Sequence, residues 1–223
     1  MLVNFGAPAR AVCMRASRET GSRVELQTER GVVPCRYHKG RRGGGAVVFV
    51  GGTDGGFDGP ANGIYATLAE DLRAAGISSL RLDFRLHKAP GDVREGTLDV
   101  LAGVAFLKSE WAGRIGLVGH SFGGAVVIDA AALSEDVDAI VTLSTQTAGT
   151  ELVGRIAPRP ILLVHGELDT RLPPRCSRYV YERAGEPKEL VILPGAKHSL
   201  RQRREELRTL LREWLVTRLG AGG

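Results

Sequence analysis

Two spacings of apolar residues alternate along this chain, and together they predict its main elements. Short apolar runs of strand length recur between residues 46 and 193, and most are followed by segments whose apolar residues repeat every three or four positions. Continuous runs are typical of strands buried on both faces, whereas the longer repeat is typical of helices with one buried face. The predicted strands are 46–50, 79–84, 115–118, 139–143, 160–165 and 189–193.

Most of the predicted helices lie between these strands. The first two are marked by apolar faces at Ile64, Leu68, Leu72 and Ala75 and at Val100, Val104, Leu107 and Trp111. A third helix follows strand 115–118, a fourth covers 173–183 with proline at its start, and a last one begins near residue 200. Strands separated by helices imply a mostly parallel α/β sheet covered by helices on both faces.

The first forty residues follow a different pattern. Between residues 10 and 38, apolar residues alternate loosely with polar ones, and polar segments at 19–22 and 29–31 interrupt them. This alternation favours short antiparallel strands at one edge of the sheet. Because 223 residues can bury one substantial core, we expect a single domain over residues 1–223.

Composition narrows the classes of function. Hydrophobic residues make up 43% of the chain and charged residues 25%, as in an ordinary globular protein, which excludes disordered and fibrous classes. The net charge of +5 comes from arginines spread over the chain, and the clusters at 41–42 and 201–204 lack the interleaved aromatic residues that stack on bases. We therefore expect a solvated basic surface and no nucleic-acid partner.

The N-terminal residues and the cysteines bear on where the protein works. Residues 1–16 contain no apolar stretch long enough for a signal peptide, and no segment approaches the length of a membrane span. Cys13, Cys35 and Cys176 are widely spaced and form no C-x-x-C pattern, so they predict neither a disulfide framework nor a thiolate metal site. We expect a cytoplasmic protein with reduced thiols and no membrane partner.

The strongest chemical signal lies where strand 115–118 ends. It runs into Gly119-His120-Ser121-Phe122-Gly123, and a helix of small and apolar residues follows. The two glycines allow the strand and the helix to approach closely, which forces the serine into a strained backbone conformation. The turn exposes Ser121 Oγ and leaves N–H groups at the start of the helix to bind a developing anion. This G-x-S-x-G turn resembles the nucleophile elbow of the α/β-hydrolase superfamily.

The same resemblance implies a base and an acid for Ser121. A serine hydroxyl needs a neutral imidazole to take its proton, so one of the five histidines must be the base. His198 lies between the last predicted strand and helix, where the superfamily has its base, whereas His120 is expected to point elsewhere. Segment 165–173 is similar to the superfamily's H-G-x-x-D-x-x-x-P acid loop, which implies Asp169 as the carboxylate that orients the base. Glu167 is the alternative.

Relatives in this superfamily bind the substrate's carbonyl oxygen with two backbone N–H groups. One is implied to belong to Phe122, which follows the nucleophile. The other comes from the loop after strand 46–50, where relatives commonly read His-Gly-x and this chain reads Gly51-Gly52-Thr53. Thr53 is the expected donor and Gly52 the alternative. The missing histidine leaves catalysis possible because the donor is a backbone group.

Two further segments depart from common relatives. Asp83 and Arg85 lie in a D-F-R sequence that many relatives continue into G-x-G-x-S, and we expect them to form a structural charge pair at the pocket floor. The segment 144–160, where many α/β-hydrolases insert a helical lid, has room for one short helix at most. We therefore expect a fold without a lid and an open pocket.

Together these features resemble the dienelactone-hydrolase and small lidless carboxylesterase branches of the superfamily. Enzymes with dienelactone activity usually use cysteine as the nucleophile, so Ser121 favours a general carboxylic-ester hydrolase that forms an acyl-enzyme. The alternatives are a thioesterase, a small peptidase, and a catalytically silent scaffold that binds a partner. The expected substrate is a small ester-type molecule, with no metal and no organic cofactor, and the expected assembly is a monomer or homodimer.

Overall fold

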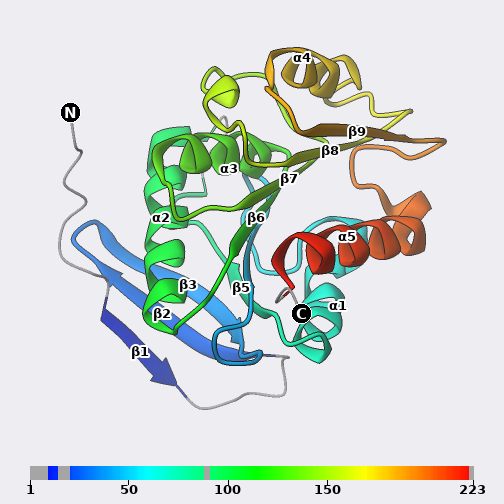
Figure 1. Cartoon of the computed structure of the whole chain (residues 1–223). Helices are drawn as coiled ribbons and strands as arrows, with labels where there is room; N and C mark the ends of the chain where they lie inside the picture. Colours follow the sequence, from blue (N-terminus) through cyan, green and yellow to red (C-terminus); the bar gives the residue numbers. More distant parts are fainter. Residues whose placement is uncertain (1–9, 15–20, 88–90, 221–223) are drawn as a thin grey trace.

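The structure, a computed structural model, describes residues 10–14, 21–87 and 91–220, with side chains from residue 21 onward (Figure 1). The strands and helices keep the order expected of alternating β and α units after residue 46. The expectations drawn from residues 1–9, from the first half of the polar segment at 19–22 and from the Cys13 thiol lie outside this described part.

Among the described residues, nine strands form one sheet in the order β1-β2-β3-β5-β4-β6-β7-β8-β9. The pairs β1–β2, β2–β3 and β3–β5 are antiparallel, and every other neighbouring pair is parallel. The strands are β1 (Arg10–Met14), β2 (Ser22–Thr28), β3 (Gly31–His38), β4 (Ala46–Val50), β5 (Ser78–Leu82), β6 (Ile115–His120), β7 (Ala139–Leu143), β8 (Ile161–Gly166) and β9 (Lys188–Leu193). The prediction of a mostly parallel sheet with antiparallel N-terminal edge strands is confirmed.

Helices cover both faces of this sheet, with α2 and α3 on one face and α1 and α5 on the other (Figure 1). Each face buries its own cluster of apolar side chains against its helices. The helices are α1 (Pro60–Ala74), α2 (Val93–Ser109), α3 (Phe122–Leu133), α4 (Arg175–Arg183) and α5 (Arg204–Leu219), with the 3-10 helices η1 (Val153–Arg155) and η2 (Arg201–Arg203). Burial on both faces explains why strands β4, β6, β7 and β8 have largely apolar sequences.

The ends of α2 show how local sequence sets helix length. The Asp92 carboxylate accepts the N–H of Glu95 at 3.1 Å and caps the start of the helix. α2 ends at Ser109, two residues before Trp111, which has a φ of 64° and is 66% exposed. The prediction that Trp111 lies on the buried face of the helix is therefore wrong. The prediction failed because the spacing of apolar residues continues past Ser109, where the helix ends. The Arg42 guanidinium lies over the indole of Trp111, 4.8 Å from the ring centroid.

The parallel strands place the loops that follow β4, β6, β8 and β9 along one edge of the sheet. All of the residues expected to carry chemistry lie on these loops or at the start of α3. The connection from β7 to β8, residues 144–160, contains only the 3-10 helix η1, as expected for a fold without a lid.

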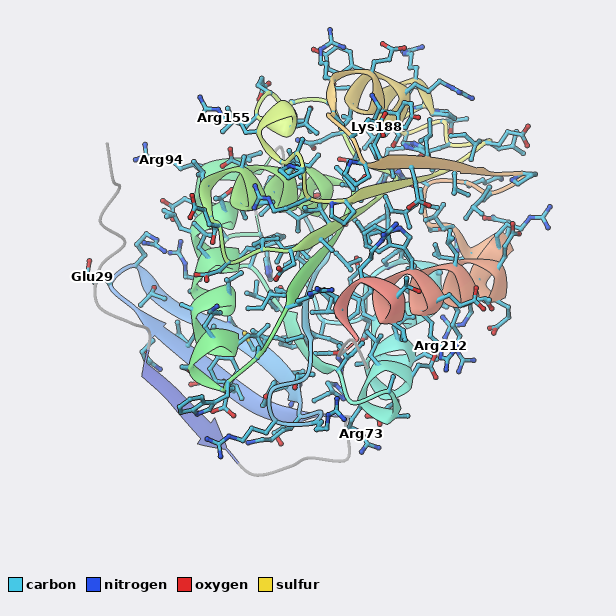
Figure 2. The ribbon with its side chains drawn as sticks, viewed as in Figure 1. Glu29, Arg73, Arg94, Arg155, Lys188 and Arg212 are labelled. Atoms are coloured by element: carbon cyan, nitrogen blue, oxygen red, sulfur yellow. The ribbon has the colours of Figure 1, made fainter. Side chains whose placement is uncertain are left out.

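Basic side chains lie on several separate elements. Figure 2 labels Arg73 on α1, Arg94 on α2, Arg155 on η1 and Arg212 on α5, and these side chains point outward from the ribbon. All four are exposed. Since α1 and α2 cover opposite faces of the sheet, the positive charge is spread over more than one face of the molecule.

Candidate active site

Ser121 forms the turn between β6 and α3. Its φ of 56° and ψ of −115° place it in a backbone conformation that residues with a side chain rarely adopt. The N–H of Ser121 donates to Leu143 O at 2.8 Å, and Ser121 O accepts the N–H of Gly124 at 3.0 Å. Hydrogen bonds on both sides therefore hold the strained turn that the G-x-S-x-G spacing predicts.

Close backbone contacts explain the glycines of this turn. A Cβ atom on Gly119 would overlap Gly123 O, and a Cβ atom on Gly123 would overlap Gly51 O. The end of β6, the start of α3 and the loop after β4 thus pack together with no room for a side chain between them. This packing places Ser121 at the edge of the sheet where the strand carboxyl ends meet.

Hydrogen bonds connect three of the predicted residues in series. His198 Nε2 lies 3.1 Å from Ser121 Oγ, and His198 Nδ1 lies 2.7 Å from Asp169 Oδ2. The Asp169 side chain is fully buried, whereas the His198 side chain is 15% exposed. The arrangement can move a proton from the serine hydroxyl to the imidazole, with the carboxylate stabilising the resulting cation.

Backbone donors orient Asp169. Its Oδ1 accepts the N–H groups of Arg171 and Leu172, each at 2.9 Å, which leaves Oδ2 for His198. The alternative carboxylate, Glu167, is exposed, and its Oε2 accepts the N–H of Gly195 at 2.8 Å. Glu167 therefore binds the loop that leads to His198, and Asp169 is the carboxylate that contacts the imidazole.

His120, inside the turn, makes a contact that no local sequence pattern predicts. Its Nε2 lies 3.1 Å from His198 O, and the two imidazole rings are 4.9 Å apart. Because a carbonyl oxygen only accepts, His120 Nε2 carries the proton of this bond. Burial lowers the pKa of His120 to about 4, so the ring is neutral at neutral pH. The ring of His120 therefore binds the backbone of His198, and His198 is the histidine that contacts Ser121 Oγ.

The loop after β4 lies against the turn that carries Ser121. A Cβ atom on Gly52 would be 3.7 Å from Ser121 Cβ and 3.8 Å from His120 Nδ1. The N–H of Gly55 donates to Gly52 O at 3.1 Å and closes a turn through Thr53. On the other side, Phe122 is the first residue of α3, and an N–H in this position has no acceptor within its helix. The two segments expected to supply oxyanion donors therefore flank Ser121.

The prediction that Asp83 and Arg85 form a charge pair is wrong. Arg85 Nε donates to Asp99 Oδ1 at 2.6 Å, because this carboxylate on α2 is only 1% exposed and requires a cation. Asp83 Oδ1 accepts the N–H of Gly56 at 2.7 Å and lies 2.8 Å from His87 Nε2. Asp83 therefore anchors the loop after β4, whereas Arg85 connects the end of β5 to α2.

The described side chains form no metal-binding cluster: within residues 21–87 and 91–220, no three His, Cys, Asp or Glu side chains are grouped to hold a metal ion. In the same part of the chain, no helix has both the length and the apolar character needed to cross a membrane. Cys35 is buried and Cys176 is partly buried, and both are free thiols.

Comparison with known sequences gives a family match over most of the chain. The model of the dienelactone hydrolase family matches residues 65–212, which include Ser121, Asp169 and His198. Among curated proteins, the uncharacterized protein YfhR of Escherichia coli strain K12 is 28% identical over 108 residues, with 38% of this chain and 38% of YfhR covered. The chain thus spans about two fifths of the length of this relative.

Solved structures agree with the α/β-hydrolase fold over almost the whole chain. A dienelactone hydrolase from Anabaena variabilis superposes with a TM-score of 0.76 at 18% identity, covering 96% of this chain and 100% of that one. XC6422 from Xanthomonas campestris, an α/β serine hydrolase without a lid, gives a TM-score of 0.72 at 18% identity, with coverages of 94% and 100%. Because both structures are only 18% identical to this chain, their similarity shows a shared fold.

Proposed function

Because this chain belongs to the dienelactone hydrolase family, we propose that it hydrolyses small carboxylic esters through an acyl-enzyme formed on Ser121. By family and fold the chain is an α/β-hydrolase enzyme. The observation that carries the proposal is the series of hydrogen bonds from Ser121 Oγ to His198 at 3.1 Å and from His198 to Asp169 at 2.7 Å.

Acylation is the first half of the proposed reaction. Ser121 Oγ attacks the carbonyl carbon of the ester while His198 Nε2 takes the hydroxyl proton. Negative charge develops on the carbonyl oxygen, where the N–H of Phe122 and that of Thr53 or Gly52 stabilise it. His198 then returns the proton to the alkoxy oxygen, the carbon–oxygen bond breaks, and the alcohol leaves.

Deacylation repeats the same steps with water. His198 removes a proton from water, the hydroxide attacks the acyl carbon, and Ser121 Oγ leaves with that proton to restore the free enzyme. Asp169 keeps the Nδ1–H tautomer of His198 in both halves and stabilises the imidazolium. Neither half requires a metal or an organic cofactor.

The short connection between β7 and β8 supports a preference for small substrates. Without a helical lid, residues 144–160 supply little apolar surface for a long acyl chain. Serine as the nucleophile favours ordinary carboxylic esters over dienelactones, for which the family usually uses cysteine. Thioesters and small peptides react by the same chemistry and are the competing substrate classes.

A fluorophosphonate probe tests the proposal. We expect intact-protein mass spectrometry to detect one adduct per chain, and peptide mapping to locate it on Ser121. Ser144 is a suitable internal control, because it follows β7 and also has a positive φ, 46°, but its side chain is buried. The Ser121→Ala variant should take up no probe and should not hydrolyse p-nitrophenyl acetate.

The result also separates the competing functions. A folded wild-type protein that stays unlabelled at Ser121 and hydrolyses no ester, thioester or peptide would identify a silent scaffold that binds a partner. Labelling at Ser121 together with a higher kcat/KM for acyl thioesters or small peptides than for matched esters would retain the acyl-enzyme and change the substrate class.

A further inference from the structure

A second histidine contacts the acid of the proposed triad from the protein interior. His165, the next-to-last residue of β8, is fully buried, and its Nε2 lies 3.2 Å from Asp169 Oδ2 and 2.7 Å from Leu172 O. Its Nδ1 lies 2.6 Å from the hydroxyl of Ser177, which is also fully buried on α4. The proposed reaction gives neither His165 nor Ser177 a role.

The partners of His165 determine its tautomer. Leu172 O can only accept a hydrogen bond, so Nε2 carries a proton. Burial lowers the pKa of His165, which keeps the ring neutral at neutral pH and leaves Nδ1 as an acceptor. The Ser177 hydroxyl therefore donates to Nδ1, and the single ring proton on Nε2 lies between Leu172 O and Asp169 Oδ2.

With this tautomer, the ring of His165 presents its N–H edge to Asp169. Oδ1 accepts the N–H groups of Arg171 and Leu172, and Oδ2 lies 2.7 Å from Nδ1 of His198 and 3.2 Å from Nε2 of His165. The protein alone therefore surrounds both oxygens of the carboxylate with donors. Rotation of the carboxylate would break several of these bonds at once, and its plane is fixed.

We propose that His165, held in place by Ser177, is a positioning residue that orients the Asp169 carboxylate toward His198. The inference rests on the proposed function, in which His198 acts on Ser121. If the carboxylate turned, Nδ1 of His198 would lose its acceptor and Nε2 would move away from the serine hydroxyl. His165 is fully buried, so it acts through Asp169 and does not touch the substrate.

Two substitutions of His165 separate positioning from packing. His165→Leu removes both ring nitrogens, and we expect kcat to fall about 10-fold to 100-fold, the range for loss of an orienting partner, while KM changes less than about 2-fold. The acidic limb of the pH–kcat profile should also move to lower pH, because a carboxylate that has turned away from His198 stabilises the imidazolium less. His165→Gln retains an N–H donor and should recover part of kcat.

His38 supplies a matched control. It is also a buried histidine, 2% exposed, and its partners are Glu70 and Arg81, away from the triad. His38→Gln should leave kcat and the pH profile unchanged even if it lowers the free energy of unfolding. If His165→Leu does not fold, Ser177→Ala keeps the ring but removes its anchor, and it should lower kcat by several-fold, about 3-fold to 10-fold.

A proton NMR measurement makes the test independent of substrate. The Nδ1 proton of His198 in its bond to Asp169 should give a low-field signal that is missing in His198→Ala. We expect this signal to shift in Ser177→Ala and in His165→Leu but not in His38→Gln. If the His165 and Ser177 variants match the His38 control in kcat, pH profile and NMR signal, the inference is wrong. An unlabelled, inactive wild type would instead reject the proposed function.

Discussion

At the scale of single residues, Ser121 combines the proposed nucleophile with a strained backbone. A residue with a Cβ atom at φ 56° and ψ −115° carries a conformational cost of about 1–3 kcal/mol. The turn keeps this conformation because Leu143 O and Gly124 N–H bind its two backbone groups. Position 121 is therefore a site where stability and activity favour different residues.

Replacing Ser121 by glycine and by alanine separates the backbone cost from the hydroxyl. Both variants lose the hydroxyl of the proposed nucleophile, but only glycine is free of the Cβ atom that disfavours this φ and ψ. We expect Ser121→Gly to unfold with a free energy about 1 kcal/mol higher than Ser121→Ala in urea titrations. An alanine variant as stable as the glycine variant would show that the turn is not strained.

Two nearby carboxylates give a second prediction at this scale. In the proposed reaction, Asp169→Asn removes the charge that stabilises the His198 imidazolium, and by analogy with serine proteases the loss in kcat is expected to approach about 10⁴-fold. Glu167→Gln is the matched control, because the Glu167 side chain binds the N–H of Gly195 and not the imidazole. Its kcat/KM for p-nitrophenyl acetate should stay within about 3-fold of the wild type. The opposite ranking would make Glu167 the acid.

At the scale of elements, the pattern of apolar residues predicted the positions of the strands, but it did not predict the hydrogen bonds of polar side chains. The strands predicted at 46–50 and 139–143 match β4 and β7, and the other four predicted strands differ from the observed ones by one or two residues at their ends. The pattern of apolar residues carries such information because it follows from which faces of a strand or helix are buried. The bonds of His120 and Asp83 join segments far apart in the chain, and no local pattern specifies which distant group a polar side chain will find.

The loop after β4 provides the prediction at this scale. The Asp83 carboxylate holds the N–H of Gly56, so Asp83→Ala should loosen the loop that carries Gly52 and Thr53. We expect kcat to fall about 10-fold, less than the loss from deleting an oxyanion donor outright. Asp54→Ala, an exposed position on the same loop, is the matched control and should retain kcat. Equal activities of the two variants would rule out Asp83 as the anchor of the loop.

At the scale of the whole molecule, the alternation of strands and helices predicted the two-faced sheet but not its strand order. β4 lies between β5 and β6, so strands consecutive in the sequence are not all neighbours in the sheet. Apolar runs specify that a strand is buried on both faces without specifying its partner. Ser121, Asp169 and His198 could be proposed as site residues because the order of the motifs in the chain implied their fold, whereas the contact of His165 with Asp169 could not be predicted.

Acid sensitivity is expected of the molecule as a whole. Burial lowers the pKa values of His38, His120 and His165 in the folded state. Below about pH 6.5 the unfolded chain binds protons that the folded chain does not, so the free energy of unfolding falls as pH decreases. Each of these histidines contributes up to about 1.4 kcal/mol per pH unit.

Urea titrations between about pH 7.5 and about pH 5.5 measure this effect above the range in which most carboxylates titrate. His38→Gln, which lies away from the triad, should give a shallower dependence than the wild type. A free energy of unfolding that is constant or rises toward pH 5.5 would contradict the expectation.

The position of α5 has a consequence for how the protein is made. α5 (Arg204–Leu219) covers the face of the sheet that carries Val47, Phe49 and Val118, and Arg208 Nε on α5 binds Asp71 Oδ2 on α1 at 2.7 Å. Ribosomes synthesise a chain from its N-terminus, so every strand of the sheet leaves the ribosome before this helix does. Until then only α1 covers this apolar face of the nascent sheet, and we expect chaperones to bind the part that α5 later covers.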